Sequence, residues 1–155
     1  AMPTIQAEQG LVSGLVPMTQ AQRWLFEQRL SEPHHWNQSL MVTMSEAPDQ
    51  PRLARALRTV IERHDALRTR FDLSNGPTAR IEAIVPCEDL LLSVDLSQVS
   101  DQELAAAVSN EAERYQQSLN LEQGPLFRAV LFDLGPNRPG RLLLIAHHLV
   151  VDRVS

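Results

Sequence analysis

Residues 142–152 read Leu-Leu-Leu-Ile-Ala-His-His-Leu-Val-Val-Asp, and this segment constrains the fold more than any other. A near-continuous aliphatic run is typical of a β-strand that is buried on both faces. The run ends in two histidines, His147 and His148, followed by Asp152. Because neighbouring side chains of a strand point to opposite faces, only one of the two imidazoles can face a given cavity.

The rest of the chain alternates between helical and strand patterns. Thr19–Gln22 and Ser100–Glu103 both carry the capping-box signature that begins a helix. The expected helices span 19–30, 51–65 and 100–119, the expected strands span 37–44, 67–72, 79–85, 126–134 and 141–147, and a further short apolar run covers 90–95. This order predicts an α/β fold in which helices cover a mixed, mostly antiparallel sheet.

Composition excludes several classes of protein. With 43% hydrophobic residues, the 155-residue chain can bury the core of one domain. A formal net charge of -5 without a concentrated basic patch argues against a nucleic-acid partner. All 14 basic residues are arginine, so a lysine nucleophile or Schiff base is excluded. Cys87 is the only cysteine and lies beside Glu88 and Asp89, so we expect a bystander thiol.

The sequence also bears on where the protein resides. No apolar run approaches the length of a transmembrane span, and the N-terminus lacks the charged-then-apolar pattern of a signal peptide. We therefore expect a cytoplasmic protein with no membrane association.

The histidine pair suggests proton transfer, although the spacing alone is weak evidence. A histidine takes a proton from a hydroxyl or amine near neutral pH. Considered alone, His-x-x-x-Asp fits a hydrogen-bonded histidine at a strand end better than a catalytic one. A metal site would need further ligands, and only His34, His35 and His64 remain as histidines, so we expect no bound metal.

Three segments, in order, resemble the core motifs of nonribosomal peptide synthetase condensation domains. Met18–Leu25 (MTQAQRWL) is similar to the first motif and Arg63–Phe71 (RHDALRTRF) to the second, Arg-His-acidic-x-Leu-Arg-x-x-Phe. His147–Asp152 resembles the His-His-x-x-x-Asp-Gly active-site motif. The resemblance implies the N-terminal lobe of a chloramphenicol-acetyltransferase-like fold, in which an active-site tunnel runs between two lobes.

The resemblance also implies the chemistry. Acyl or peptidyl carrier proteins would present phosphopantetheine-bound substrates, and the acceptor would be a small molecule or a second carrier protein, with no cofactor bound directly. His148 would act as general base or positioning hydrogen-bond partner while an amine or hydroxyl attacks the thioester. His147 and Asp152 would support the site structurally, with Asp152 in an ion pair. Arg68 would lie near the tunnel in a supporting role.

Two departures from the family pattern are visible. Arg153 replaces the motif glycine, and it would narrow the tunnel, contact an anionic substrate or pair with Asp152. The chain also stops three residues after the motif, so we expect residues 17–155 to form one lobe, inactive alone, and residues 1–16 to be a flexible leader. Ala1 before Met2 resembles a remnant of tag removal, which favours a free-standing enzyme or the first domain of its chain.

Three alternatives to a condensation enzyme stay open at this point. An epimerization domain shares the motif, and Pro33–Ser39 (PHHWNQS) and the Val12–Pro17 leader are reminiscent of that branch. A coenzyme-A-dependent acyltransferase of the same fold would turn over acyl-CoA without a carrier protein. A non-catalytic module would only dock carrier proteins.

Overall fold

A computed structural model describes residues 10–84 and 90–152 of the chain. Cys87 and Arg153 lie outside these ranges. The elements in chain order are β1 (Gly14–Val16), α1 (Gln20–Glu27), η1 (Pro33–His35), β2 (Asn37–Thr43), α2 (Gln50–Arg63), η2 (Asp65–Arg68), β3 (Thr69–Asp72), β4 (Thr78–Ile81), β5 (Leu91–Asp95), α3 (Asp101–Gln116), β6 (Phe127–Asp133) and β7 (Arg141–His147).

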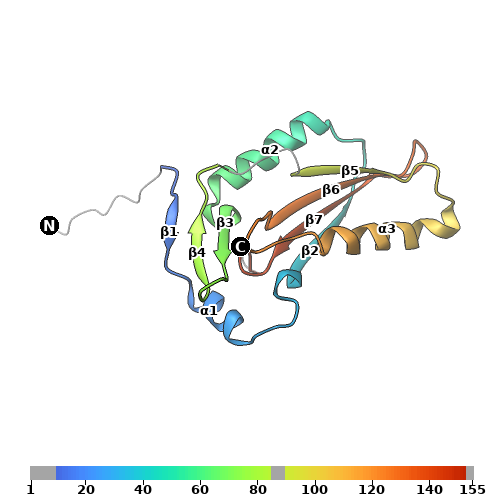
Figure 1. The fold of residues 1–155 in the computed structure, drawn as a ribbon. Coiled ribbons are helices and arrows are strands. Elements are labelled where there is room, and N and C mark those ends of the chain that lie inside the picture. Colours follow the sequence, from blue (N-terminus) through green and yellow to red (C-terminus); the bar gives the residue numbers. More distant parts are fainter. Residues whose placement is uncertain (1–9, 85–89, 153–155) are drawn as a thin grey trace.

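The strands form two sheets, which lie beside one another in Figure 1. The smaller sheet has the order β1-β4-β3 and is antiparallel throughout. The larger has the order β2-β7-β6-β5, with antiparallel β2-β7 and β7-β6 pairs and a parallel β5-β6 pair. The expected mixed, mostly antiparallel α/β fold is therefore confirmed, with its strands divided between two sheets.

Strand β7 is central in the larger sheet and is covered on both faces, as its aliphatic run predicts. Leu143 and Ile145 pack into one buried cluster with Val108 and Tyr115 of α3. Leu142 points to the opposite face, where its cluster includes residues of α1, α2 and the smaller sheet. Helix α3 runs along the larger sheet, and α2 lies above the sheets in Figure 1.

Helices α1 and α3 both begin where their sequences predict, but only α1 has the predicted capping box. The Thr19 hydroxyl accepts from the backbone N–H of Gln22 at 3.2 Å, and the Gln22 amide oxygen accepts from the Thr19 N–H at 2.9 Å. At α3, the Ser100 hydroxyl instead donates to the Glu103 carboxylate at 2.6 Å and caps no backbone group. The second predicted capping box is therefore wrong, because the two side chains bond each other.

Local geometry shifts several predicted boundaries. Helix α1 ends at Glu27 rather than near Leu30, and Arg29 has a φ of 49°, outside helical geometry. Strand β3 begins at Thr69, because the preceding four residues form η2. We expected residues 1–16 to form a flexible leader, but Gly14–Val16 form strand β1, which pairs with β4. Residues 1–9 lie outside the described part of the chain.

Candidate active site

His147 ends β7 and lies wholly inside the protein. Its ring Nε2 donates to the carbonyl of Pro33 at 2.8 Å, and its Nδ1 accepts from the backbone N–H of Leu149 at 3.2 Å. The side chain is 0% exposed. These two bonds fix the ring as the neutral Nε2–H tautomer and close the turn that follows the strand.

Burial determines the charge of His147. Desolvation lowers the pKa of the imidazole to about 4, against a smaller raising effect from the Pro33 carbonyl. His147 is therefore neutral near pH 7 and cannot reach a substrate. The structural role that the resemblance implies for His147 stays a prediction.

His148 follows the strand and is half-buried. Its backbone N–H donates to the carbonyl of Trp36 at 2.8 Å, which continues the β2-β7 ladder by one bond. The imidazole stacks on the Trp36 ring with centroids 4.5 Å apart and planes at 32°. Its Nδ1 lies 3.3 Å from the Val151 carbonyl, and the side-chain amide nitrogen of Gln38 lies 3.1 Å from Nε2.

A cavity of about 350 Å³ borders His148. The first and third motifs supply most of its wall, and the second contributes one residue. The lining residues are Thr19, Ala21, Gln22, Trp24, Trp36, Ala66, His148, Leu149, Val150, Val151 and Asp152. The wall is therefore mainly apolar and aromatic, with few polar groups, as is usual for small-molecule sites.

Helix α1 is tied to the turn that carries His148. The Gln22 amide that completes the capping box also donates from Nε2 to the Leu149 carbonyl, at 3.0 Å. Trp24 lies beside Trp36, with ring centroids 6.3 Å apart. Both tryptophans line the cavity, and Trp36 stacks on the imidazole of His148.

Arg68 is elsewhere in the molecule. Its guanidinium is 1% exposed, donates to the carbonyls of Val12 and Glu82, and pairs with Asp65. These bonds join the segment before β1, the end of β4 and η2. Arg68 is not among the residues that line the His148 cavity. Ala66 is the residue of the second motif that lines it.

Asp152 is exposed and lines the cavity, four residues after His148. The next position, Arg153, lies outside the described residues, so the structure does not test the predicted effects of that arginine. The predicted ion pair of Asp152 likewise stays a prediction.

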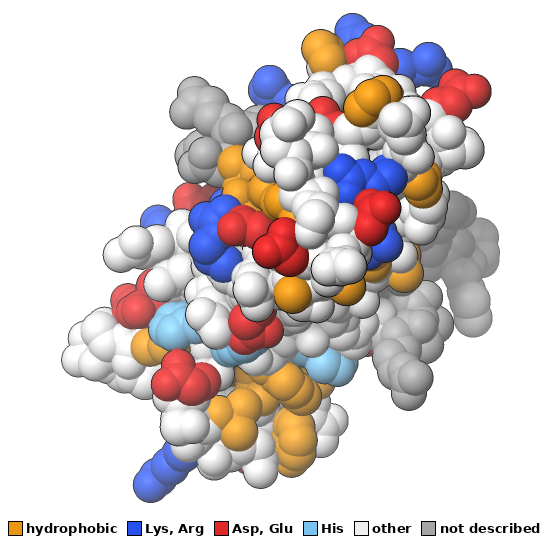
Figure 2. Space-filling view, turned by 90° about the vertical axis from the view of Figure 1, so that its right-hand side faces the viewer, with side chains coloured by type: hydrophobic (Ala, Val, Ile, Leu, Met, Phe, Trp, Pro, Cys, Tyr) orange, Lys and Arg blue, Asp and Glu red, His pale blue; other side chains and the backbone are white. Residues whose placement is uncertain are grey.

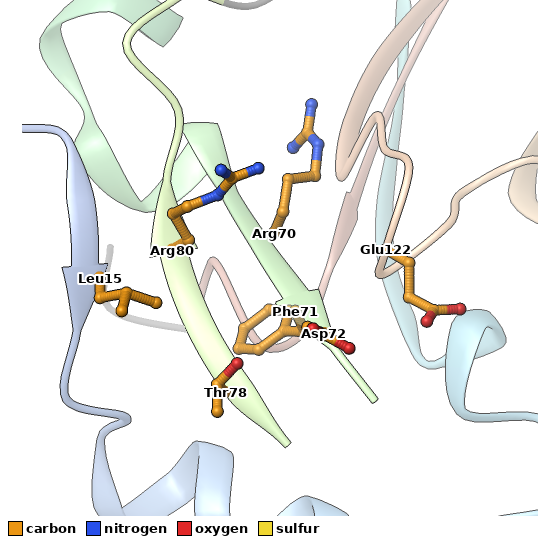
Figure 3. Close-up of a pocket in the computed structure, with 7 residues that line it drawn as sticks. All are labelled: Leu15, Arg70, Phe71, Asp72, Thr78, Arg80 and Glu122. Atoms are coloured by element: carbon orange, nitrogen blue, oxygen red, sulfur yellow. The ribbon is translucent and has the colours of Figure 1, made fainter. Parts of the chain in front are cut away.

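A second cavity, of about 410 Å³, lies against the smaller sheet (Figure 3). Arg70 and Arg80 are directly opposite each other on β3 and β4. Glu82 lies 2.7 Å from Arg80 and offsets the repulsion between the two guanidinium groups. The Asp72 carboxylate, whose pKa is lowered by its hydrogen bonds from Ser74, is likewise engaged locally. None of the predicted site residues that the structure describes lines this cavity, so we place the candidate active site at His148.

The described residues contain neither a metal-binding cluster nor a membrane-spanning helix. No group of three or more His, Cys, Asp or Glu side chains is arranged to hold a metal ion there. Within the same part of the chain, no helix is both long and apolar enough to cross a bilayer. On the face shown in Figure 2, basic and acidic side chains are interspersed.

Two neighbours of His148 are not predicted by the sequence. Trp36 and Gln38 belong to the segment that resembles epimerization domains, but their sequence context assigns them no role at the site. They reach the imidazole because β2 pairs with β7 in the register that places Gln38 opposite Ala146. That register is a long-range property. A tryptophan followed by alternating polar and apolar residues predicts a strand but not its partner.

The fold is the chloramphenicol-acetyltransferase-like fold that solved condensation and epimerization domains share. The condensation-domain family profile matches residues 12–155, which is nearly the whole chain. The chain belongs to the condensation-domain family of nonribosomal peptide synthetases, as its three motifs predict.

Curated relatives are much longer than this chain. A linear gramicidin synthase of Brevibacillus parabrevis is 44% identical over 153 residues, covering 99% of this chain and 3% of the relative. Chondramide synthase cmdD of Chondromyces crocatus is 40% identical over 156 residues, covering 100% of this chain and 4% of the relative. The chain thus spans a small part of each synthetase.

Solved structures of two domain types share the fold. The epimerization domain from the third module of tyrocidine synthetase B superposes with a TM-score of 0.88 at 31% identity, covering 98% of this chain and 33% of that one. The starter condensation domain of rhizomide synthetase gives a TM-score of 0.70 at 27% identity, covering 92% and 35%. The chain therefore corresponds to about a third of either solved chain.

Proposed function

We propose that the domain containing this chain acts on a phosphopantetheine thioester presented by a carrier protein, with His148 at the reacting centre. The observation that carries the proposal is the position of the His148 imidazole. It is half-buried on a cavity walled by the first and third motifs, while its neighbour His147 is held neutral inside the protein. A half-buried imidazole beside an apolar cavity is suited to proton transfer near neutral pH.

The reaction predicted from the sequence is acyl transfer. An amine or hydroxyl acceptor adds to the thioester carbonyl and forms the C–N or C–O bond as its proton passes to His148. The C–S bond then breaks, and the pantetheine sulfur leaves as a thiol after receiving that proton. Positioning the two substrates supplies much of the acceleration for an amine, whereas proton removal matters more for a hydroxyl.

Epimerization is the second candidate, and one observation favours it. The TM-score with the tyrocidine epimerization domain, 0.88, exceeds the 0.70 of the starter condensation domain. In this reaction His148 would remove the α-hydrogen of a carrier-bound aminoacyl group as a proton. A proton would then return to the opposite face of the α-carbon, so no bond to a second substrate forms.

The two reactions are separated by intact-mass analysis of the loaded carrier protein, using the complete domain in deuterated buffer. Acyl transfer gives a product that joins both substrates and empties the donor carrier. Epimerization incorporates one deuterium at the α-carbon with no joined product. A variant of the rhizomide starter condensation domain is solved in complex with C8-CoA, so acyl-CoA without a carrier is included as a donor.

The role of His148 is tested by His148→Ala in the same assay. Because a positioned general base contributes typically about 10²–10⁴-fold, we expect a rate loss in that range, with the fold retained because the side chain is only half-buried. His35→Ala, at an exposed histidine outside the three motifs and outside the cavity wall, is the matched control. Full activity in His148→Ala would contradict the proposal. Carrier binding without any turnover in the unaltered domain would favour the docking module.

We also propose the remaining roles from the resemblance. Carrier proteins are the partners, and the phosphopantetheine arm is theirs rather than a cofactor of this chain. Asp152 and Arg153 shape the loop beside the cavity, and Arg68 supports the site at a distance by holding β1 to β4. The cytoplasm is the proposed location, because the sequence has neither a signal-peptide pattern nor an apolar run of membrane-spanning length.

A further inference from the structure

One face of the smaller sheet carries polar and charged side chains and borders the cavity of about 410 Å³ (Figure 3). Phe71 and Ala79 pack into the core, so the residues that alternate with them point to the opposite face. Glu122, in the loop after α3, lines the same cavity. The polar side chains that β3 and β4 contribute to its wall are Arg70, Asp72, Thr78 and Arg80.

Arg70 is buried in this face without a carboxylate partner among the described residues. It is 9% exposed, because Gly124 packs against its guanidinium so closely that a built Cβ would overlap it. Its Nη1 donates to the Thr69 carbonyl at 2.8 Å, and the edge that carries Nε–H and Nη2 has no acceptor in the described part of the chain. A buried charge without a partner is costly, so this edge is suited to bind an anion.

The electrostatics of the cavity favour an anion as well. Desolvation by burial lowers the pKa of the Arg70 guanidinium, and attraction by Glu82 offsets only part of this effect. Glu82 itself pairs with Arg80 at 2.7 Å. Arg80 is directly opposite Arg70 on β4, where like charges repel. An anion bound between the two guanidinium groups would reduce both the desolvation cost and the repulsion.

The cavity also limits the kind of anion. The edge of a guanidinium matches two oxygens of a carboxylate or a phosphate, and such charge-assisted bonds are strong. Figure 3 shows both guanidinium groups toward one end of the cavity and the carboxylates of Asp72 and Glu122 toward the other. A ligand with many negative charges would be repelled by these carboxylates. The cavity therefore fits a small anion rather than a polyanion.

We propose that this cavity is a binding site for a small oxyanion, a phosphate or a carboxylate, which the Nε–H and Nη2 edge of Arg70 holds together with Arg80. The walls of this cavity and of the His148 cavity share no described residue. The site is therefore separate from the proposed active site and does not depend on the proposed function. Arg70 also occupies a position that the second motif leaves unspecified, so the site is a feature of this chain rather than of the motif.

The test is a titration of the complete domain with inorganic phosphate and, separately, with acetate, each replacing chloride at constant ionic strength. Arginine is labelled with ¹⁵N, and the Nε–H signal of Arg70 is the one that Arg70→Gln lacks. We expect a saturable shift of this signal, with half-saturation on the order of 1 mM. Tighter binding of phosphate than of acetate would assign the site to phosphates, and the reverse order would assign it to carboxylates.

Two variants test the proposed ligands of the anion. Arg70→Gln should weaken binding roughly tenfold or more, read from the Arg80 signal, because the charge-assisted bonds of Arg70 are lost. Arg80→Gln should weaken it less, read from the Arg70 signal, because Arg80 also pairs with Glu82. Arg55→Gln, at an exposed arginine of α2 outside the cavity wall, is the matched control and should leave binding unchanged.

Urea unfolding without phosphate distinguishes a binding residue from a structural one. Arg70→Gln should lower the unfolding midpoint little, because the change removes a buried charge that has no carboxylate partner among the described residues. A large loss of stability together with unchanged anion binding would make Arg70 structural only and overturn the proposal.

The absence of a saturable shift in the complete domain would overturn the proposal too, including the case in which a carboxylate of the rest of the domain occupies the Arg70 edge. If Arg70→Gln misfolds, the wild-type titration and Arg80→Gln decide. None of these measurements depends on turnover. A failure of the proposed function at His148 would therefore leave the result at Arg70 intact.

Discussion

His147 and His148 are adjacent in the chain, yet their surroundings differ in every respect that matters for proton transfer. The ring of His147 has both nitrogens bonded to backbone groups and no exposed surface. The ring of His148 has one face on Trp36 and an edge toward a cavity. Neighbouring side chains of a strand point to opposite faces, so the two rings point away from each other. The turn that His147 closes holds His148 beside the cavity.

The depressed pKa of His147 predicts a pH-dependent stability. In the unfolded chain this histidine titrates near 6.5, whereas in the folded protein its pKa is about 4. The unfolded state therefore binds the proton first, and stability is lost as pH falls through that interval. The loss attributable to this group is about 3 kcal/mol once both states are protonated.

The measurement is urea unfolding of the wild type and of His147→Gln between pH 4 and pH 7. The variant is less stable at neutral pH, by roughly 1–3 kcal/mol, because the flexible amide does not reproduce both hydrogen bonds of the buried ring. Its stability should fall less steeply with acid than that of the wild type. His64→Gln, at an exposed position, should keep the wild-type slope. Parallel pH curves for wild type and His147→Gln would contradict the assigned burial effect.

Helix α1 carries the first motif and contributes to the active site through its first turn. The same Gln22 side chain completes the cap on Thr19 and donates to the turn after β7. Thr19 itself lines the cavity. Fixing the start of the helix therefore fixes one wall of the site.

The two predicted capping boxes should differ in their contribution to stability. Thr19→Ala removes a side-chain acceptor for a backbone N–H and should cost about 0.5–2 kcal/mol of unfolding free energy. Ser100→Ala removes a hydroxyl that caps no backbone group and should cost less than about 0.5 kcal/mol. Chemical denaturation of both variants measures the difference. Equal losses would mean that the Ser100 hydroxyl caps α3 in solution.

The elements differ in how far local sequence determines them. The long helices and β7 follow from periodicity, because their apolar residues repeat with the period of the structure that buries them. Strand β1 has three residues, and only its pairing with β4 makes it a strand. The same limit applies to the site. His148 is marked by its motif, whereas Trp36 and Gln38 reach it through long-range register that no local pattern contains.

At the scale of the whole molecule, the loop between α3 and β6 joins the two sheets. Leu121 in this loop is 0% exposed, and its carbonyl accepts from the Phe71 N–H of β3 at 2.8 Å. Its own N–H donates to Nδ1 of His34 in η1 at 3.0 Å. One loop therefore connects the second motif to the segment that leads into β2, and so to the strand that contacts His148.

Gly124, in the same loop, lies close against Arg70 of the smaller sheet. Its φ is +77°, and a Cβ built there would overlap the guanidinium of Arg70 on β3. Gly124→Ala therefore combines backbone strain of about 1–2 kcal/mol with the smaller cost of displacing the Arg70 guanidinium from its bond to the Thr69 carbonyl. Gly76→Ala is the matched control, because Gly76 has a φ of +95° but nothing within 4 Å of its Cβ position.

Urea unfolding of both alanine variants should therefore show a larger loss at Gly124 than at Gly76. Truncating the obstructing side chain should remove the excess, so Arg70→Ala combined with Gly124→Ala should be less destabilised than the sum of the single changes, by about 0.5–3 kcal/mol. Equal losses at the two glycines, or additive effects in the double variant, would mean that the guanidinium moves away without cost. The loop would then join the sheets through Leu121 alone.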